Sequence, residues 1–320
     1  MGCEAPICVN VRSAHVGTDR EMVVLLHGSA SSGALWRHTK GALQSRYRCI
    51  APDLIGYGAS AAWPQQTAFG LEAELRAIEP LLQCCADTFH LVGYSYGGVL
   101  ALHLALANPP RVRSLTLIEP VFFAALKYAG DWTSYLEFCG VRDEFVSTLA
   151  DDERELAMRR FVDFWMGDDA WTRLSADARA SMLKVADKIV LDWQASFAAD
   201  PGRARLSTLE VRTLLVRGSD SPRPMRALVD ALHAIMPGSA RTVVEGANHL
   251  LPLTHVSVLT SAILSNLRAG AQRRLDDPSY SSPRVAGGSD GPSVQCLVSL
   301  HRQLGAFDHG RGHPQQARRR

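Results

Sequence analysis

Short, almost continuously apolar segments alternate with helical patterns along most of this chain, and that alternation is the strongest constraint on its fold. Met22–Leu26 reads MVVLL and residues 114–118 read SLTLI, both typical of strands buried on two faces. Such strands form parallel sheets that helices cover on either side. The other predicted strands are 47–51, 89–92, 212–216 and 240–244, and the predicted helices are 71–85, 96–107, 224–235 and 253–267. The sequence therefore predicts an α/β fold.

Two long segments interrupt this pattern. Residues 120–205 hold 13 of the 23 aromatic residues, and helical spacing dominates them. Residues 271–320 are rich in Gly, Pro and Ser and carry eight Arg against four Asp, so we expect a largely disordered tail there. The predicted organisation is a core at 1–119 and 206–270, a helical insertion at 120–205, and the tail at 271–320.

Charge, hydropathy and cysteine spacing exclude several classes of protein. The net charge is +2 over 320 residues, and a basic tail on a near-neutral body differs from the basic folded face of a nucleic-acid-binding domain. No apolar run approaches the about 20 residues that span a bilayer, and no secretory signal precedes the first strand. The seven cysteines include no C-x-x-C pair and no zinc spacing, which favours free thiols. We expect a cytoplasmic protein with no nucleic-acid partner and no membrane insertion; the sequence does not indicate its oligomeric state.

A candidate nucleophile follows the predicted strand at 89–92. In a parallel sheet, ligands bind beyond the carboxyl ends of the strands. The residues at that position, 93–97, read GYSYG, a G-x-S-x-G pattern between a strand and a helix. In this context the pattern places the serine on a sharp, strained turn with its hydroxyl exposed, and the glycines leave room for the turn. The pattern therefore predicts that Ser95 is a nucleophile.

This turn, together with the segments LLHGSASSGALW and PDLIGYGAS, resembles the α/β-hydrolase superfamily, and in particular bacterial single-domain serine hydrolases with a helical cap. The resemblance covers residues 22–118 and 206–268. It implies a mostly parallel eight-stranded sheet with helices on both faces. It also implies a helical cap inserted after strand six, which the aromatic segment would form.

The resemblance assigns the remaining catalytic roles. The oxyanion-hole donors would be two backbone N–H groups, those of Tyr96 and of Ser29, the latter in the loop that follows the third strand of the family's sheet. The general base would be His249, which follows the last predicted strand. The acid would be Asp220, just past the strand at 212–216, and Glu119, just past the strand at 114–118, is the alternative acid.

The predicted reaction is acyl transfer to water. A serine hydroxyl is a weak nucleophile until a base removes its proton, and a Ser-Asp-His triad supplies that base without a metal or an organic cofactor. The aromatic segment favours a small apolar ester-like substrate, with Gly28, Tyr94, Trp132 and Trp165 as candidate substrate-binding residues. A carbon–carbon bond hydrolase and a cofactor-free perhydrolase are alternatives on the same fold. A small-molecule receptor on a hydrolase scaffold is the alternative from another class.

Overall fold

A single parallel sheet organises the described part of the chain. The computed structural model describes residues 10–11, 20–64, 67–83 and 88–275. Six strands lie in the order β3-β2-β5-β6-β7-β8, and every neighbouring pair is parallel. Their bounds are β2 Met22–Leu26, β3 Arg48–Ile50, β5 Phe89–Tyr94, β6 Val112–Ile118, β7 Arg212–Gly218 and β8 Ser239–Val244. The α/β prediction is confirmed in this sheet.

The number of strands differs from the expectation. Eight strands were predicted, whereas the described residues place six in the main sheet. Two further short strands, β1 (Asn10–Val11) and β4 (Pro52–Asp53), pair with each other in antiparallel fashion, outside the main sheet. The described residues ahead of β2 therefore add a separate ribbon instead of widening the sheet.

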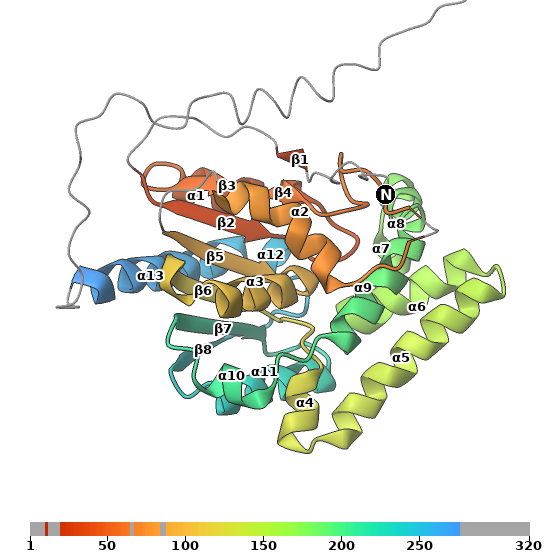
Figure 1. The fold of residues 1–320 in the computed structure, drawn as a ribbon. Helices are drawn as coiled ribbons and strands as arrows, with labels where there is room; N and C mark the ends of the chain where they lie inside the picture. Colours follow the sequence, from red (N-terminus) through yellow and green to blue (C-terminus); the bar gives the residue numbers. More distant parts are fainter. Residues whose placement is uncertain (1–9, 12–19, 65–66, 84–87, 276–320) are drawn as a thin grey trace, which may run out of the picture. The chain divides into compact units, whose positions relative to one another are not determined.

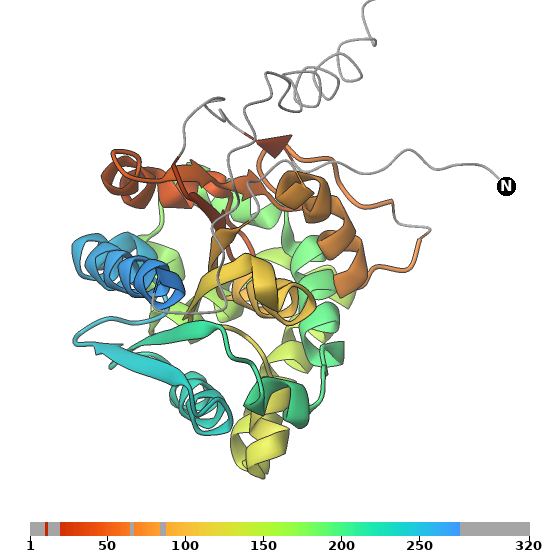
Figure 2. The ribbon, with the colours of Figure 1, turned by 60° about the vertical axis from the view of Figure 1, so that its left-hand side comes forward.

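Helices cover both faces of the sheet, as the apolar strands require (Figures 1 and 2). Alternate side chains of β2 point to opposite faces, so Val23 and Leu25 join one apolar cluster while Val24 and Leu26 join the other. The first cluster is covered by α1 (Arg37–Leu43) and α13 (Val256–Leu275), and the second by α2 (Leu71–Gln83), α3 (Tyr96–Ala107) and α11 (Arg223–Ile235).

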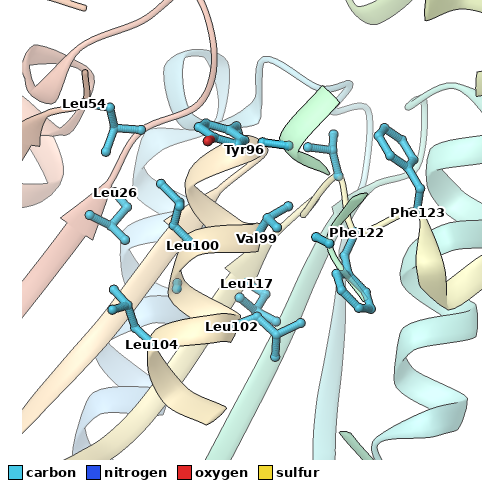
Figure 3. Packing of buried hydrophobic residues seen from close by; sticks show 14 of the residues in the cluster. Leu26, Leu54, Tyr96, Val99, Leu100, Leu102, Leu104, Leu117, Phe122 and Phe123 are labelled. Atoms are coloured by element: carbon cyan, nitrogen blue, oxygen red, sulfur yellow. The ribbon is translucent and has the colours of Figure 1, made fainter. Parts of the chain in front are cut away.

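Helix α3 lies in the middle of the larger cluster and fixes the turn that precedes it. Its sequence, YGGVLALHLALA, is apolar on nearly every side, and ten of its twelve residues are buried. Figure 3 shows Val99, Leu100 and Leu104 of α3 beside Leu26 of β2 and Leu117 of β6. A helix that is apolar all round belongs in the interior of a fold. Residues just before α3 are therefore held rigidly at the end of β5.

A helical insertion joins β6 to β7. Its helices are α4 Ala124–Ala129, α5 Trp132–Ala150, α6 Arg154–Met166, α7 Ala170–Arg173, α8 Ala176–Leu183, α9 Ala186–Ala198 and α10 Arg203–Ser207. Figure 1 shows α5, α6 and α9 together beyond one end of the sheet. Stacked and edge-on aromatic rings hold them, including Phe123 on Trp193 and Phe138 on Trp165. The insertion and the core belong to one compact unit.

The C-terminal boundary of the core also differs from the expectation. Helix α13 continues to Leu275, five residues past the predicted boundary at 270. The rest of the predicted tail, 276–320, lies outside the described residues. No helix in the described ranges is both long and apolar enough to cross a membrane.

Candidate active site

Ser95 occupies a strained turn between β5 and α3. Its backbone has φ 53° and ψ −119°, a left-handed conformation that is uncommon for residues with a side chain. The flanking positions require glycine because neighbouring backbone atoms leave no room for a Cβ atom there. A Cβ at Gly93 would lie 2.3 Å from the carbonyl oxygen of Gly97, and one at Gly97 would lie 2.4 Å from that of His27. Both glycines of the G-x-S-x-G pattern are thus needed for this backbone.

His249 contacts Ser95 from the loop that follows β8. Its Nε2 lies 3.2 Å from the Ser95 hydroxyl oxygen, and the residue is 5% exposed. The Tyr94 hydroxyl donates to the backbone carbonyl of His249 at 2.8 Å. The indole of Trp165, from α6, stacks on the imidazole with a centroid distance of 4.3 Å and an interplanar angle of 28°. The imidazole is therefore held from the core and from the insertion.

Glu119 binds the other nitrogen of His249. It is the first residue after β6, it is fully buried, and its backbone has φ 43°. Its Oε2 lies 2.6 Å from Nδ1 of His249. Its Oε1 accepts the Gly218 N–H at 2.7 Å and the Ser221 hydroxyl. Ser95, His249 and Glu119 thus form a continuous hydrogen-bonded chain at the carboxyl edge of the sheet.

Known proteins share this architecture. Residues 21–256 match the family described as alpha/beta hydrolase fold. The chain belongs to this family. The resemblance seen in the sequence is thereby confirmed over most of the residues that carried it.

Several relatives of this α/β-hydrolase carry the names of ester-cleaving enzymes. A "Pimeloyl-[acyl-carrier protein] methyl ester esterase" of Aeromonas hydrophila is 29% identical over 254 residues, covering 73% of this chain and 90% of that protein. "Probable lysophospholipase BODYGUARD 1" of Arabidopsis thaliana is 37% identical over 126 residues, but the chain spans only 27% of its length. A hydrolase from Pseudomonas aeruginosa has the same fold, with a TM-score of 0.64, 18% identity, and 81% and 98% of the two chains covered. These similarities support the prediction of a hydrolase of the carboxylic-ester type.

The structure does not bring Asp220 to His249. The Asp220 side chain is exposed, and its Oδ1 accepts the Ser219 hydroxyl at 2.7 Å. The turn after β7, where the acid was expected, instead directs the Gly218 N–H and the Ser221 hydroxyl at Glu119. Because Nδ1 of His249 is already paired with Glu119, the alternative acid occupies the place predicted for Asp220.

The loop after β2 passes directly beside the Ser95 turn. A Cβ at Gly28 would lie 2.8 Å from the Ser95 Cβ, so only glycine allows this approach. His27 holds the loop by a bond between its Nδ1 and the Gly28 carbonyl at 2.7 Å, while its Nε2 accepts the Leu54 N–H at 2.9 Å. Burial lowers the pKa of His27 to about 4, so the ring is neutral near pH 7, as an accepting Nε2 requires.

The two predicted oxyanion donors lie in suitable local structure. The Tyr96 N–H is at the first position of α3, where backbone donors lack an intrahelical acceptor and the helix dipole is positive. The Ser29 N–H follows Gly28 in the loop next to Ser95. Within the described ranges, neither amide makes a loop, turn or cap hydrogen bond to the backbone.

A cavity of about 350 Å³ opens above Ser95 and His249. Most of its wall is apolar and comes from the insertion, including Phe123, Phe161, Trp165, Met182 and Trp193. Of the predicted substrate-binding residues, Tyr94 and Trp165 line it. Gly28 lies beside Ser95 and is not part of the wall, and Trp132 is 55% exposed on α5, away from the cavity lining. The exposed position of Trp132 shows that aromatic content alone does not identify pocket residues.

A buried charge cluster reaches this cavity through Asp192, which lines it, and nothing in the sequence patterns singled the cluster out. Lys188 and Asp192, one turn apart on α9, form an ion pair. The Lys188 ammonium also donates to Glu74 of α2 at 2.9 Å. Asp192 Oδ2 accepts the hydroxyls of Ser29 and Tyr57, both at 2.6 Å. The available signal was a Lys-x-x-x-Asp pair on one helix, which spacing alone cannot distinguish from a surface pair.

The cluster holds two carboxylates against one ammonium. Burial raises the pKa of Glu74 to about 7, and Asp192 adds to that rise while Lys188 opposes it. Burial lowers the pKa of Lys188, but Asp192 and then Glu74 outweigh it, so that pKa ends above its ordinary value. Lys188 is therefore charged at pH 7, and its positive charge offsets the buried negative charge of Glu74 and Asp192. Among the described residues, no group of His, Cys, Asp and Glu has an arrangement that could hold a metal ion.

We expect Lys188→Met to lower the free energy of unfolding by about 3–5 kcal/mol, because the change leaves buried carboxylates without their cation. Without Lys188 the pKa of Glu74 rises further, so the native state binds that proton more tightly than the unfolded state does. Stability is then lost as pH rises, and the loss is larger at pH 8 than at pH 6. Urea unfolding at both pH values measures this loss of stability.

Lys184→Met, at an exposed position next to the same helix, is the control and changes stability by about 0.5 kcal/mol or less. A Lys188→Met protein as stable as the control would contradict this account of the cluster.

Proposed function

We propose that this protein is a serine hydrolase that cleaves a carboxylic ester of a small apolar substrate through a Ser95–His249–Glu119 triad and an acyl-enzyme. The observation that carries the proposal is the continuous chain from the Ser95 hydroxyl through the imidazole to a buried carboxylate, with distances of 3.2 Å and 2.6 Å. These roles require a nucleophile, a base in hydrogen-bonding reach of it, and a group that orients the base. All three are met at one edge of the sheet.

Acylation begins with proton transfer from Ser95 to Nε2 of His249 as the serine oxygen attacks the ester carbonyl carbon. The carbonyl electrons move to oxygen, and the Ser29 and Tyr96 N–H groups donate to that oxyanion. Glu119 stabilises the imidazolium that forms, because its carboxylate already accepts the Nδ1–H. When the tetrahedral intermediate collapses, the carbon–oxygen bond to the alcohol breaks. His249 gives its proton to the departing alkoxide, which leaves as the alcohol.

Deacylation repeats these steps with water. His249 removes a proton from a water molecule as that water attacks the acyl carbon. The second tetrahedral intermediate uses the same two amides. Its collapse returns the electron pair to the Ser95 oxygen, which takes the proton from His249, and the carboxylic acid is released. The chain's own residues therefore balance every proton and electron pair in the cycle.

The helical insertion acts as the cap in this proposal. The insertion supplies more than half of the residues that line the cavity, and the wall is mostly apolar. Its aromatic and methionine residues there are Phe123, Phe161, Trp165, Met166, Met182 and Trp193. Binding of an apolar chain there is stabilised by about 25 cal/mol for each Å² of apolar surface removed from water. A cavity of about 350 Å³ fits a small or medium-sized ester.

A fluorophosphonate probe tests this function directly. The probe forms a covalent bond to an activated serine, and the proposal expects stoichiometric labelling of the wild-type protein at Ser95. Ser95→Ala should remove the label, whereas Ser147→Ala, at an exposed position on α5, should leave it unchanged. A series of p-nitrophenyl esters of increasing chain length then gives the preferred acyl size. A folded wild-type protein that neither labels nor hydrolyses any ester of the series would argue for a binding protein instead.

A further inference from the structure

The cavity has one polar wall that the proposed triad chemistry does not use. Ser196 lies on α9, one turn after Asp192, and both side chains line the cavity. Ser196 is 1% exposed, yet its hydroxyl has no hydrogen-bond partner. A buried hydroxyl without a partner costs about 1–3 kcal/mol. A hydroxyl that lines a cavity can regain that free energy when a ligand supplies the missing bond.

Asp192, on the same wall, keeps one unused acceptor site, on Oδ1. A carboxylate has about four acceptor sites. Three are taken, by Ser29, Tyr57 and Lys188. The Ser29 hydroxyl, which also lines the cavity, donates its proton to Asp192 and keeps its own lone pairs. The wall thus offers a donor at Ser196 and acceptors at Asp192 and Ser29, fixed in place by buried bonds.

The charge balance selects the chemistry of the ligand group. Lys188 already pairs with Asp192, and a second cation would lie close to this charged ammonium at the wall of a mostly apolar cavity, which disfavours a cationic ligand group. A hydroxyl group, by contrast, donates one hydrogen bond and accepts others, and this matches one acceptor and one donor on the wall. The Ser29 side chain belongs to the residue whose N–H we assign to the oxyanion hole. The polar wall therefore begins beside the reacting carbonyl.

We propose that Ser29, Asp192 and Ser196 form a hydroxyl-binding subsite, so that the preferred substrate is an ester whose apolar chain carries a hydroxyl group. This inference rests on the proposed ester hydrolysis. The subsite turns an otherwise general apolar cavity into a selective one, because an analogue that lacks the hydroxyl leaves buried polar groups unpaired.

Matched esters test the subsite. Ethyl hexanoate is compared with ethyl 2-, 3- and 6-hydroxyhexanoate, and the quantity measured is the ratio of kcat/KM for each hydroxy ester to that for ethyl hexanoate. The wild-type protein should prefer at least one isomer by about tenfold or more. In Ser196→Ala that ratio should fall to about 2 or less, whereas Ser147→Ala keeps the wild-type ratio. The ratio is internal to each variant, so a partial loss of folded protein does not affect it.

Three results would overturn the subsite. One is a wild-type protein that prefers none of the hydroxy esters, and another is an unchanged preference in Ser196→Ala. The third is a stronger preference for ethyl 6-aminohexanoate, which would indicate a cation site. If the wild-type protein hydrolyses none of these esters, the proposed function fails separately. Calorimetric titration with the same esters then decides the subsite: about tenfold tighter binding of a hydroxy isomer supports it, and equal binding rejects it.

Discussion

Ser95→Ala and His249→Ala are each expected to lower kcat by about 10⁶-fold while the fold is retained. Ser95 supplies the bond-forming oxygen, and His249 carries the proton in both directions, so neither loss can be replaced by a neighbour. Because the two groups act as a unit, the double variant should be about as slow as either single variant. Ester hydrolysis under saturating substrate measures kcat, and circular dichroism checks the fold.

Two control variants test whether the loss of activity is specific to Ser95 and His249. His38→Ala removes an exposed histidine on α1, and Ser147→Ala removes an exposed serine on α5. Both should keep the wild-type rate. If Ser95→Ala retained more than about a hundredth of the wild-type kcat, the assignment of Ser95 as nucleophile would be wrong, since the oxyanion hole and binding alone leave far less.

Glu119→Gln is expected to lower kcat by about 10⁴-fold, by analogy with the loss of the acid in other triads. The carboxylate accepts hydrogen bonds at both oxygens, from His249 on one side and from Gly218 and Ser221 on the other. A glutamine has one oxygen and one NH₂ group. Whichever way it is turned, a donor faces a donor, and the imidazole loses either its tautomer or its orientation.

Asp220→Asn is the matched test of the alternative acid. Asp220 is exposed and pairs with Ser219, so its loss should change kcat by about twofold or less. Steady-state kinetics of both variants, at a pH where the wild-type rate is constant, give the comparison. The opposite outcome, an active Glu119→Gln and an inactive Asp220→Asn, would return the acid role to Asp220 and require a rearranged loop.

Local pattern predicted the elements that carry the site. Met22–Leu26 and Tyr96–Ala107 were expected and are found with those bounds, because each is apolar on all sides and flanked by turn residues. The expected contact of Ser95 with His249 is also present. Ser95 directly follows β5 and His249 lies in the loop after β8, and the carboxyl ends of parallel strands meet at one edge.

The sequence could not decide which acid pairs with His249, because that choice depends on distances across the sheet. Asp220 and Glu119 both follow strands whose ends are adjacent, and both are acids of suitable chemistry. The choice between them is made by the left-handed backbone at Glu119 and by the donors of the β7 turn. The buried cluster of Glu74, Lys188 and Asp192 was likewise hidden, since its members come from elements more than 100 residues apart in the chain.

The stacking of Trp165 on His249 has a consequence for how such a protein could be re-engineered. The indole belongs to the insertion and the imidazole to the core, and Asn248 adds a second link by donating to the Met166 carbonyl at 2.9 Å. Exchanging the insertion for one from another enzyme would therefore alter more than the shape of the pocket. The transplanted segment would have to bring its own ring to brace the proton-carrying side chain, or the chimera would bind its new substrate and turn it over slowly.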